Sequence, residues 1–393
     1  MAAPLDGLRV LDLSINSPGP LATMMLADFG AEVIQIIRPG FELFGSSYAG
    51  DVAEDPYINS RGKPHDAVMR NKRSLALDLK SDAGKAVMRQ LVEHADVLLE
   101  EFRPGKLAKL GFGYDEVAAI NPRLIYCSLS GFGQDGPYRD YAAHDINYLA
   151  LSGALDMIRE KDGQPVNPQN ILSDNGGGSM SAVTGILLAL LHRERTGSGQ
   201  YIDANCTDSV IYLMMDIFST ALGGQHPSSS WRETFMGRLP NYRCYRCADD
   251  TWLAIGALER HFCEALFENL GQPELMALME DRQRWPELST HLESTFASRP
   301  RTAWLEQLQA VDSCVTPVLS PEQVMQDSRF REREVMVEAF DVPQPGVMPR
   351  LSESPGQIRS APATPGQHSR EILLELGFSE DEYANLQSMG ITE

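Results

Sequence analysis

The sequence contains two residues, Asp174 and His144, whose types and settings suit acid–base or nucleophilic chemistry. Asp174 stands before three glycines and before an apolar-periodic segment that predicts a helix over residues 180–195. Backbone N–H groups and the helix dipole favour an anion at such a position, so we expect Asp174 to stay ionised. A carboxylate held there can act as a general base or as a nucleophile, and the alternative is an ordinary helix-capping aspartate.

His144 follows a polar loop and precedes a second helix-like segment, residues 146–155. Histidine is the side chain most easily poised to take or give a proton near neutral pH. A lone histidine in this place can also be a capping or core residue. Together with Asp174, however, it forms a pair of bases that could hold opposite protonation states, which suits reactions at the carbon next to a carbonyl group.

The elements expected in the first third of the chain alternate between strand and helix. Apolar runs predict strands at residues 8–13, 32–37, 74–79, 96–102 and 124–129, and helices at residues 21–29 and 81–94. This alternation predicts an α/β fold with a parallel sheet and right-handed crossovers. Ligands of such sheets bind at the carboxyl ends of the strands, where the sequence has Pro- and Gly-containing turns at residues 16–19, 38–40 and 103–105.

Changes in composition divide the remainder of the chain. Residues 41–68 are polar and turn-rich and predict a long loop, which in a compact domain is usually functional. Residues 219–240 are rich in Ser, Gly, Pro and Thr and predict a linker. A smaller α+β segment is expected after it, and a pair of helices is expected at residues 369–376 and 380–389.

Net charge and motif content exclude several classes of partner and cofactor. The formal net charge of −20 argues against nucleic acid or an anionic membrane as a partner. No stretch approaches the roughly 20 apolar residues that span a bilayer, and no secretory or peroxisomal signal is recognisable, so we expect a cytoplasmic protein. The first strand is not followed by G-x-G-x-x-G and there is no P-loop, so we expect no nucleotide redox cofactor.

The cysteine spacing does not favour a metal site. Cys244 and Cys247 form one C-x-x-C pair, and His261 and Cys263 follow. A zinc site would need a second pair at comparable spacing, so we expect ordinary buried thiols and no metal.

Basic residues near the ends of the first strands could grip a phosphate-bearing ligand. They are Arg38, Arg70, Lys72, Arg73 and Arg103. The alternative is that they are solvated surface charges.

Several long motifs resemble the family III coenzyme-A transferases, the CaiB/BaiF superfamily. They are LxGLRVLDLS at residues 5–14, KRSLALDLKS at 72–81, FRPG at 102–105, YCSLSGFGQDGPY at 126–138 and PGQHSREILLELGFS at 365–379. Three further motifs resemble the α-methylacyl-CoA racemase branch in particular: AHDINYLALSGAL at 143–155, NILSDNGGGSM at 170–180 and DSCVTPVL at 312–319. Transferases of the family usually carry a residue other than histidine where this chain has His144.

The resemblance implies a role for each candidate residue. Asp174 and His144 would be the two bases that flank the α-carbon of a 2-methylacyl-CoA thioester, Glu259 would orient His144, and Asn170 would support Asp174. The residues that the resemblance places around the substrate and its coenzyme A are Arg38, Asn71, Lys72, Arg73, Arg103, Asp145, Tyr148, Gly176 and Gly177.

The activity implied by the resemblance is racemisation or epimerisation of 2-methylacyl-CoA, without metal and without a cofactor beyond the coenzyme A of the substrate. The alternative is a family III transferase in which Asp174 attacks the thioester and forms covalent intermediates. The resemblance also implies an interlocked homodimer. Its large Rossmann-like domain would span residues 1–218, completed by 325–393, with a linker at 219–240 and a small α+β domain at 241–324. In such a dimer Glu259 would act either within its own chain or from the neighbouring subunit.

Overall fold

The computed structural model describes residues 3–41, 63, 66–160, 163–223, 237 and 239–393. Most of the long loop expected at 41–68 and most of the linker expected at 219–240 therefore lie outside the described residues. The chain divides into two compact units, of which the first comprises Met1–Leu155, Asn167–Leu213 and Ser328–Glu393. The second comprises Asp156–Val166 and Met214–Asp327. The smaller unit thus starts earlier than the boundary expected at residue 241, and it also takes in a short segment before Asn167.

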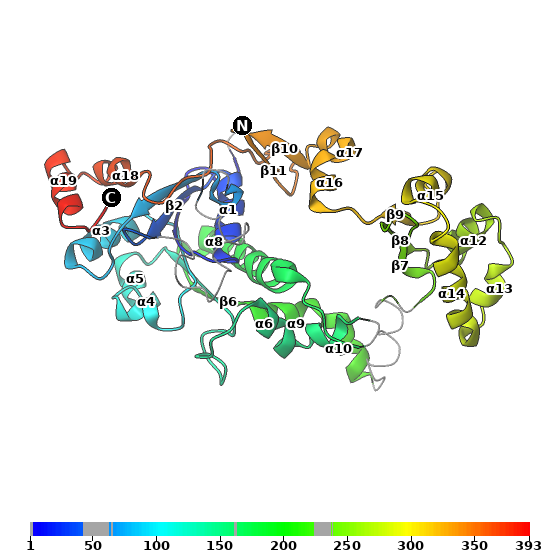
Figure 1. The fold of residues 1–393 in the computed structure, drawn as a ribbon. Helices are drawn as coiled ribbons and strands as arrows, with labels where there is room; N and C mark the ends of the chain where they lie inside the picture. The colour runs from blue at the N-terminus through cyan, green and yellow to red at the C-terminus, as the bar shows by residue number, and fades with distance from the viewer. Residues whose placement is uncertain (1–2, 42–62, 64–65, 161–162, 224–236, 238) are drawn as a thin grey trace. The chain divides into compact units, whose positions relative to one another are not determined.

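A six-stranded sheet of parallel strands forms the centre of the first unit (Figure 1). Its strands are β1 (Arg9–Leu13), β2 (Glu32–Ile37), β3 (Lys72–Ala76), β4 (Val97–Glu100), β5 (Ile125–Ser130) and β6 (Tyr201–Asn205). They lie in the order β3-β2-β1-β4-β5-β6, so the winding of the sheet reverses between β1 and β4. The α/β fold with a parallel sheet that the sequence predicts is confirmed. β3 is displaced by two to three residues from its expected position.

Apolar side chains cover both faces of this sheet, which explains why its strands read as nearly continuous hydrophobic runs. On one face α1 (Gly19–Asp28) and α8 (Met180–Thr196) pack against Val33, Leu99 and Ile125. The helices of the opposite face are α3 (Asp82–Glu93), α5 (Tyr114–Ile120), α18 (Ser369–Glu375) and α19 (Glu380–Ser388). The last two come from the end of the chain, so both ends of the sequence build one core.

Short helices and one hairpin complete the first unit. The hairpin joins β10 (Met336–Ala339) to β11 (Val342–Pro345). The helices are α4 (Lys106–Lys109), α6 (Asp145–Ser152), α9 (Cys206–Leu213) and α17 (Ser328–Glu332), and α7 (Ala154–Met157) runs across the boundary between the two units. A π-helix, Leu172–Ser179, leads directly into α8.

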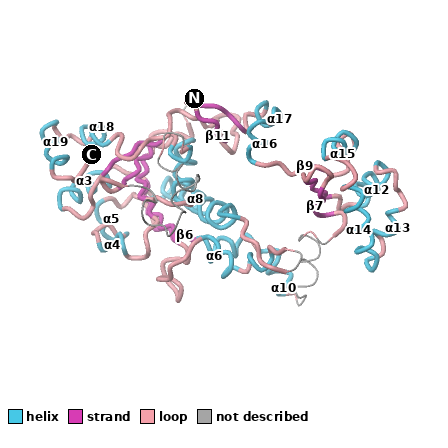
Figure 2. The backbone as a smooth tube through the Cα atoms, in the orientation of Figure 1, coloured by secondary structure: helices cyan, strands magenta, loops and turns pink. Residues whose placement is uncertain are grey.

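The second unit contains a three-stranded antiparallel sheet with helices packed against it (Figure 2). The strands are β7 (Tyr242–Arg246), β8 (Trp252–Gly256) and β9 (Val315–Pro317). The helices that share its core are α12 (Arg260–Asn269), α13 (Leu275–Met279), α14 (Trp285–Phe296) and α15 (Arg301–Leu308). The unit also contains α10 (Met215–Leu222) and α16 (Pro321–Gln326). Its core is aromatic at the centre, where Phe296 lies 5.1 Å from Tyr245 and 5.3 Å from Trp304 between ring centroids. Among the described residues, no helix is long and apolar enough to cross a membrane.

Candidate active site

A pocket of about 480 Å³ lies at the carboxyl ends of β1, β4 and β5 in the first unit. Because the winding of the sheet reverses between β1 and β4, the connections that follow these two strands diverge and leave a crevice. Such a volume suits a small-molecule ligand. The residues that line the pocket are Asn16, Ser17, Pro18, Glu101, Phe102, Arg103, Pro104, Leu129, Ser130, Gly131, Phe132, Arg139, Tyr141, Ala142, Ala143, His144, Asp145, Asn147, Tyr148, Asp174 and Cys206.

Asp174 lies inside the π-helix and not at the cap that its position before the glycines suggests. π-helical turns are rare and occur frequently at functional sites. Burial of the carboxyl group raises the pKa of Asp174 to about 7, and the negative charge of Asp145 adds to this rise. The expectation that Asp174 stays ionised is therefore wrong: near neutral pH its protonated and ionised forms are similarly populated, which suits a group that both takes and gives a proton.

The glycines that follow Asp174 serve the packing of the π-helix. A Cβ atom on Gly178 would lie 2.9 Å from the Sγ atom of Cys206 and 2.9 Å from the Cγ atom of Pro18. A Cβ atom on Gly177 would lie 3.3 Å from the carbonyl oxygen of Cys206. Gly177 therefore lets α9 approach the π-helix, whereas a Cβ atom on Gly176 would lie 3.1 Å from the carbonyl oxygen of Ile171. Neither glycine is among the residues that line the described pocket.

The first turn of α6 brings His144, Asp145 and Tyr148 to the same pocket. His144 is exposed and is the N-cap of the helix, and its backbone N–H donates to Oδ1 of Asn147 at 3.1 Å. Asp145 is buried, and its Oδ1 accepts the backbone N–H of Asp174 at 2.9 Å. Burial raises the pKa of Asp145, while this N–H lowers it. The pocket thus holds both bases predicted from the sequence, and Asp145 joins their two helices.

Tyr148 forms part of an aromatic wall of the pocket. Its hydroxyl group donates to the carbonyl oxygen of Ala143 at 2.9 Å, and its ring meets Phe132 edge to face at 5.2 Å. Gly131 makes room for this ring, because a Cβ there would lie 2.2 Å from Cε1 of Tyr148. Burial is the largest cause that raises the pKa of Tyr148, which therefore stays protonated and serves as a wall and a hydrogen-bond donor.

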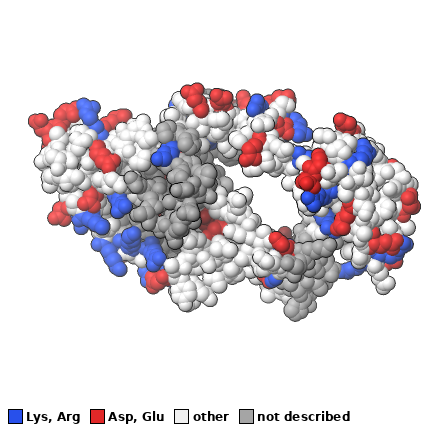
Figure 3. Space-filling model, viewed as in Figure 1, with Lys and Arg blue, Asp and Glu red and all other residues white. Residues whose placement is uncertain are grey.

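Of the residues expected to hold coenzyme A, Arg103 lines the pocket and Arg38 is exposed just after β2. The guanidinium group of Arg38 lies 5.6 Å from the centre of the Phe41 ring. Arg139 also lines the pocket, although the sequence did not single it out. Figure 3 shows blue side chains gathered over α4, the helix that follows Arg103 and contains Lys106 and Lys109. Local positive charge is therefore present despite the negative net charge.

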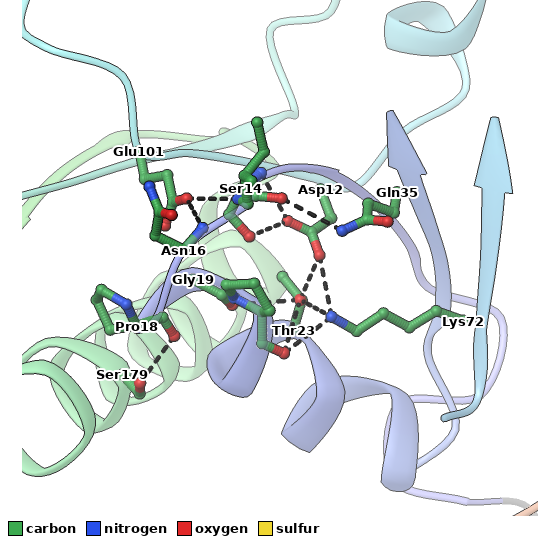
Figure 4. A network of polar contacts seen from close by, with 12 residues as sticks. Asp12, Ser14, Asn16, Pro18, Gly19, Thr23, Gln35, Lys72, Glu101 and Ser179 are labelled. Carbon is green, nitrogen blue, oxygen red and sulfur yellow. Dashed lines mark hydrogen bonds and ion pairs between the residues drawn. The ribbon is translucent and has the colours of Figure 1, made fainter. Parts of the chain in front are cut away.

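Lys72 does not face the pocket, contrary to its expected role. Its ammonium group is fully buried and donates to Oδ2 of Asp12 at 3.1 Å, to Oγ1 of Thr23 at 2.7 Å and to the carbonyl oxygen of Pro20 at 2.8 Å (Figure 4). An ammonium group has three N–H donors, and these contacts use all of them. Lys72 therefore neutralises a buried aspartate inside the sheet.

Asn71 and Arg73 are likewise engaged elsewhere. The amide nitrogen of Asn71 donates to Oδ1 of Asp28 at 2.8 Å and to the carbonyl oxygen of Gln357 at 2.7 Å. Arg73 pairs with Glu32 at 2.8 Å and with Glu375 at 2.7 Å. The carboxylates that bind these two side chains are distant in sequence, which explains why the side chains look free in the sequence. The structure gives all three residues of the 71–73 segment internal partners in place of the expected ligand.

Asn170 and Glu259 are the remaining predicted residues. Asn170 lies at a non-helical kink just before the π-helix, with φ −83° and ψ 18°. Glu259 is exposed and is the N-cap of α12 in the second unit. Its pairing with His144, within one chain or from a partner, stays a prediction.

The expectation that the cysteines are buried thiols holds only in part. Cys244 is exposed and Cys247 is buried. Over the part of the chain that the structure describes, no group of three or more His, Cys, Asp or Glu residues is arranged to hold a metal ion.

Comparison with known proteins identifies the family of this chain. The model of CoA-transferase family III matches residues 5–369. The alpha-methylacyl-CoA racemases of Homo sapiens and Mus musculus are 40% and 38% identical, each over 99% of this chain and 97% of the relative. The succinyl-CoA:glutarate CoA-transferase of Mus musculus is 32% identical over 99% of this chain and 90% of the relative. A solved CaiB/BaiF family protein from Brucella suis has a TM-score of 0.80 at 28% identity, covering 96% of this chain and 100% of the other.

The chain is therefore an enzyme and belongs to CoA-transferase family III. This confirms the family resemblance drawn from the sequence motifs. Racemases and transferases both occur among its relatives.

Proposed function

We propose that this enzyme interconverts the R and S forms of 2-methylacyl-CoA thioesters by removing and returning the α-proton. The observation that carries the proposal is the presence of His144 and Asp174 on the walls of one pocket, each reachable by a bound ligand. Identity supports it further, since the racemases reach 38–40% where the transferase of Mus musculus reaches 32%.

The proposed reaction uses the two bases in turn. One of them removes the α-proton from one face of the carbon and the other supplies a proton to the opposite face, so the two must differ in protonation state at the start. Asp174 suits this requirement because its raised pKa, about 7, makes both of its forms accessible near neutral pH. His144 supplies the second base.

The intermediate of this reaction is an enolate, whose negative charge has to be stabilised. α6 begins at the pocket with His144 as its N-cap, so the positive end of the helix dipole lies where that charge would develop. Arg103 and Arg139 supply positive charge on the same pocket for the phosphates of coenzyme A. No further cofactor and no metal are part of the proposal.

Incubation of the enzyme with one enantiomer of a 2-methylacyl-CoA in deuterated water tests this proposal. We expect one deuteron to enter at the α-carbon and the stereochemical purity to fall, without any acceptor acid. Absence of exchange at Cα, together with transfer of coenzyme A to an added carboxylic acid and a hydroxylamine-sensitive adduct on Asp174, would establish the transferase alternative instead. That alternative has support in the transferase relatives and in the accessibility of Asp174 from the pocket.

We also propose that the enzyme acts as a cytoplasmic homodimer. Large apolar side chains support an interface between copies, since Leu188 and Leu191 of α8 are exposed. A dilution series that measures activity and sedimentation together should show that activity is lost as the dimer dissociates. A fully active monomer would refute the dimer as the functional unit.

A further inference from the structure

Glu101 follows β4 at the point where the sheet reverses its winding, and it joins two walls of the pocket. One carboxyl oxygen, Oε1, accepts the backbone N–H groups of both Ile15 and Asn16 in the loop after β1 (Figure 4). The other, Oε2, is buried against Gly19, where an added Cβ would lie 2.8 Å from it. Glu101 lies outside the sequence motifs named above, and it has no role in the proposed acid–base reaction of His144 and Asp174.

The loop that Glu101 holds is bonded in turn to the π-helix of Asp174. The hydroxyl group of Ser17 donates to Oδ1 of Asn175 at 3.0 Å. The hydroxyl group of Ser179 donates to the carbonyl oxygen of Pro18 at 2.8 Å (Figure 4). Asn175 and Ser179 belong to the same eight-residue π-helix as Asp174, so hydrogen bonds and one short loop connect Glu101 to the helix that carries the base.

We infer that Glu101 is a positioning residue, which fixes the loop of residues 15–18 and, through this loop, the π-helix that presents Asp174 to the pocket. This inference rests on the proposed function only in its activity test, which measures the racemase reaction. The position of Asp174 that Glu101 would maintain is the same whether Asp174 acts as a base or as a nucleophile. Glu101 acts through the loop and is not itself assigned a step of the chemistry.

The surroundings of Glu101 favour a neutral carboxyl group. Burial raises the pKa of Glu101 to about 8, against the N–H bonds of Ile15 and Asn16, and the charge of Asp12 adds to the rise. The charge of Asp12, which is paired with Lys72, acts on Glu101, and the charge of Glu101 in turn raises the pKa values of Tyr148 and Cys206. Near pH 7 a neutral acid can still accept both N–H bonds through one oxygen, and above pH 8 the ionised group adds a buried negative charge beside the loop of residues 15–18. An amide side chain can accept the same two bonds at every pH.

Amide hydrogen exchange of the ligand-free enzyme tests the structural part of the inference. In Glu101→Ala we expect faster exchange in residues 14–19 and also in residues 172–179, whereas Glu101→Gln should match the wild type in both segments. Glu100→Ala is a matched control, because its carboxyl group binds the hydroxyl of Ser128 at 2.6 Å and the N–H of Phe102 at 2.9 Å, and not the 15–18 loop. Unchanged exchange of residues 172–179 in Glu101→Ala would overturn the inference.

Activity of the same variants tests its consequence for the reaction. We expect Glu101→Ala to lower kcat by about 10²-fold, as a small misplacement of a reacting group does, and Glu101→Gln to restore it. Glu101→Gln should also remove any change of kcat centred near pH 8. A Gln variant as impaired as the Ala variant would contradict positioning through the two N–H bonds. If the wild type neither exchanges the α-proton nor transfers coenzyme A, the proposed function fails, while the amide exchange still decides the role of Glu101.

Discussion

Asp174 and Asp145 share one wall of the pocket, and each affects the proton affinity of the other. Burial is the main cause that raises the pKa of Asp174, and the charge of Asp145 is the second. Asp145 also holds Asp174 in place by accepting its backbone N–H. One residue thus supports both the position and the proton affinity of the base.

Asp145→Asn separates these two effects. An amide oxygen can still accept the N–H of Asp174, but the negative charge is gone, so the pKa of Asp174 falls. Since a base works only when ionised, the acidic limb of kcat/KM should move to lower pH, by up to about one unit. A pH–rate profile measures the shift, with Asp140→Asn in the exposed loop before His144 as the control. An acidic limb that stays in place or moves to higher pH would contradict the role given to Asp145.

At the scale of single residues, the sequence indicates which side chains lie at the pocket better than it indicates which side chains they contact. Asp174 and His144 stand out because each precedes a helical pattern, and both line the pocket. Lys72 looked like a ligand for phosphate because its partner Asp12 lies 60 residues earlier. The raised pKa of Asp174 depends on burial and on Asp145, which lies 29 residues away, and no local pattern reveals it.

Among the elements, the π-helix is the one that carries Asp174. Its extra residue per turn brings Asp174 to the pocket while Ser173 and Ser179 remain buried. The sequence predicts a helix only from residue 180 onward and leaves the glycines before it outside the helix, because Gly-rich segments ordinarily interrupt helices. The parallel strands were predictable, since burial on both faces demands apolar runs. The short strands β9, β10 and β11 were not, because three or four residues carry too little pattern.

Gly178→Ala tests the packing of the π-helix. The added methyl group would lie 2.9 Å from the Cys206 and Pro18 side chains, so we expect a loss of about 1–3 kcal/mol in the free energy of unfolding. Gly185→Ala in α8 is the control, because its methyl group meets only the side chain of Ile202, at 3.1 Å. Urea unfolding followed by circular dichroism compares the two variants. Equal stability of Gly178→Ala and the wild type would show that the π-helix is not tightly packed at this point.

The C-terminal helices complete the core of the first unit. Ile372, Leu373 and Leu386 of α18 and α19 pack into the core formed by β1, β2 and β3. The sequence indicates the two final helices, but it does not indicate where they pack, because their partners lie about 300 residues earlier. Only the family resemblance implied a domain built from both ends of the chain. The family model matches residues 5–369, and the solved Brucella suis protein covers 96% of this chain, so most of the first unit has the architecture of the family.

In the proposed reaction His144 and Asp174 act on opposite faces of the same α-carbon. Stereospecific exchange in deuterated water by single-base variants tests it most directly, with R and S 2-methylacyl-CoA assayed separately. Each of His144→Ala and Asp174→Asn should abolish racemisation yet retain α-proton exchange for one enantiomer only, and the retained enantiomer should differ between the two variants. Retention of the same enantiomer by both variants, or undiminished racemisation by His144→Ala, would contradict the account.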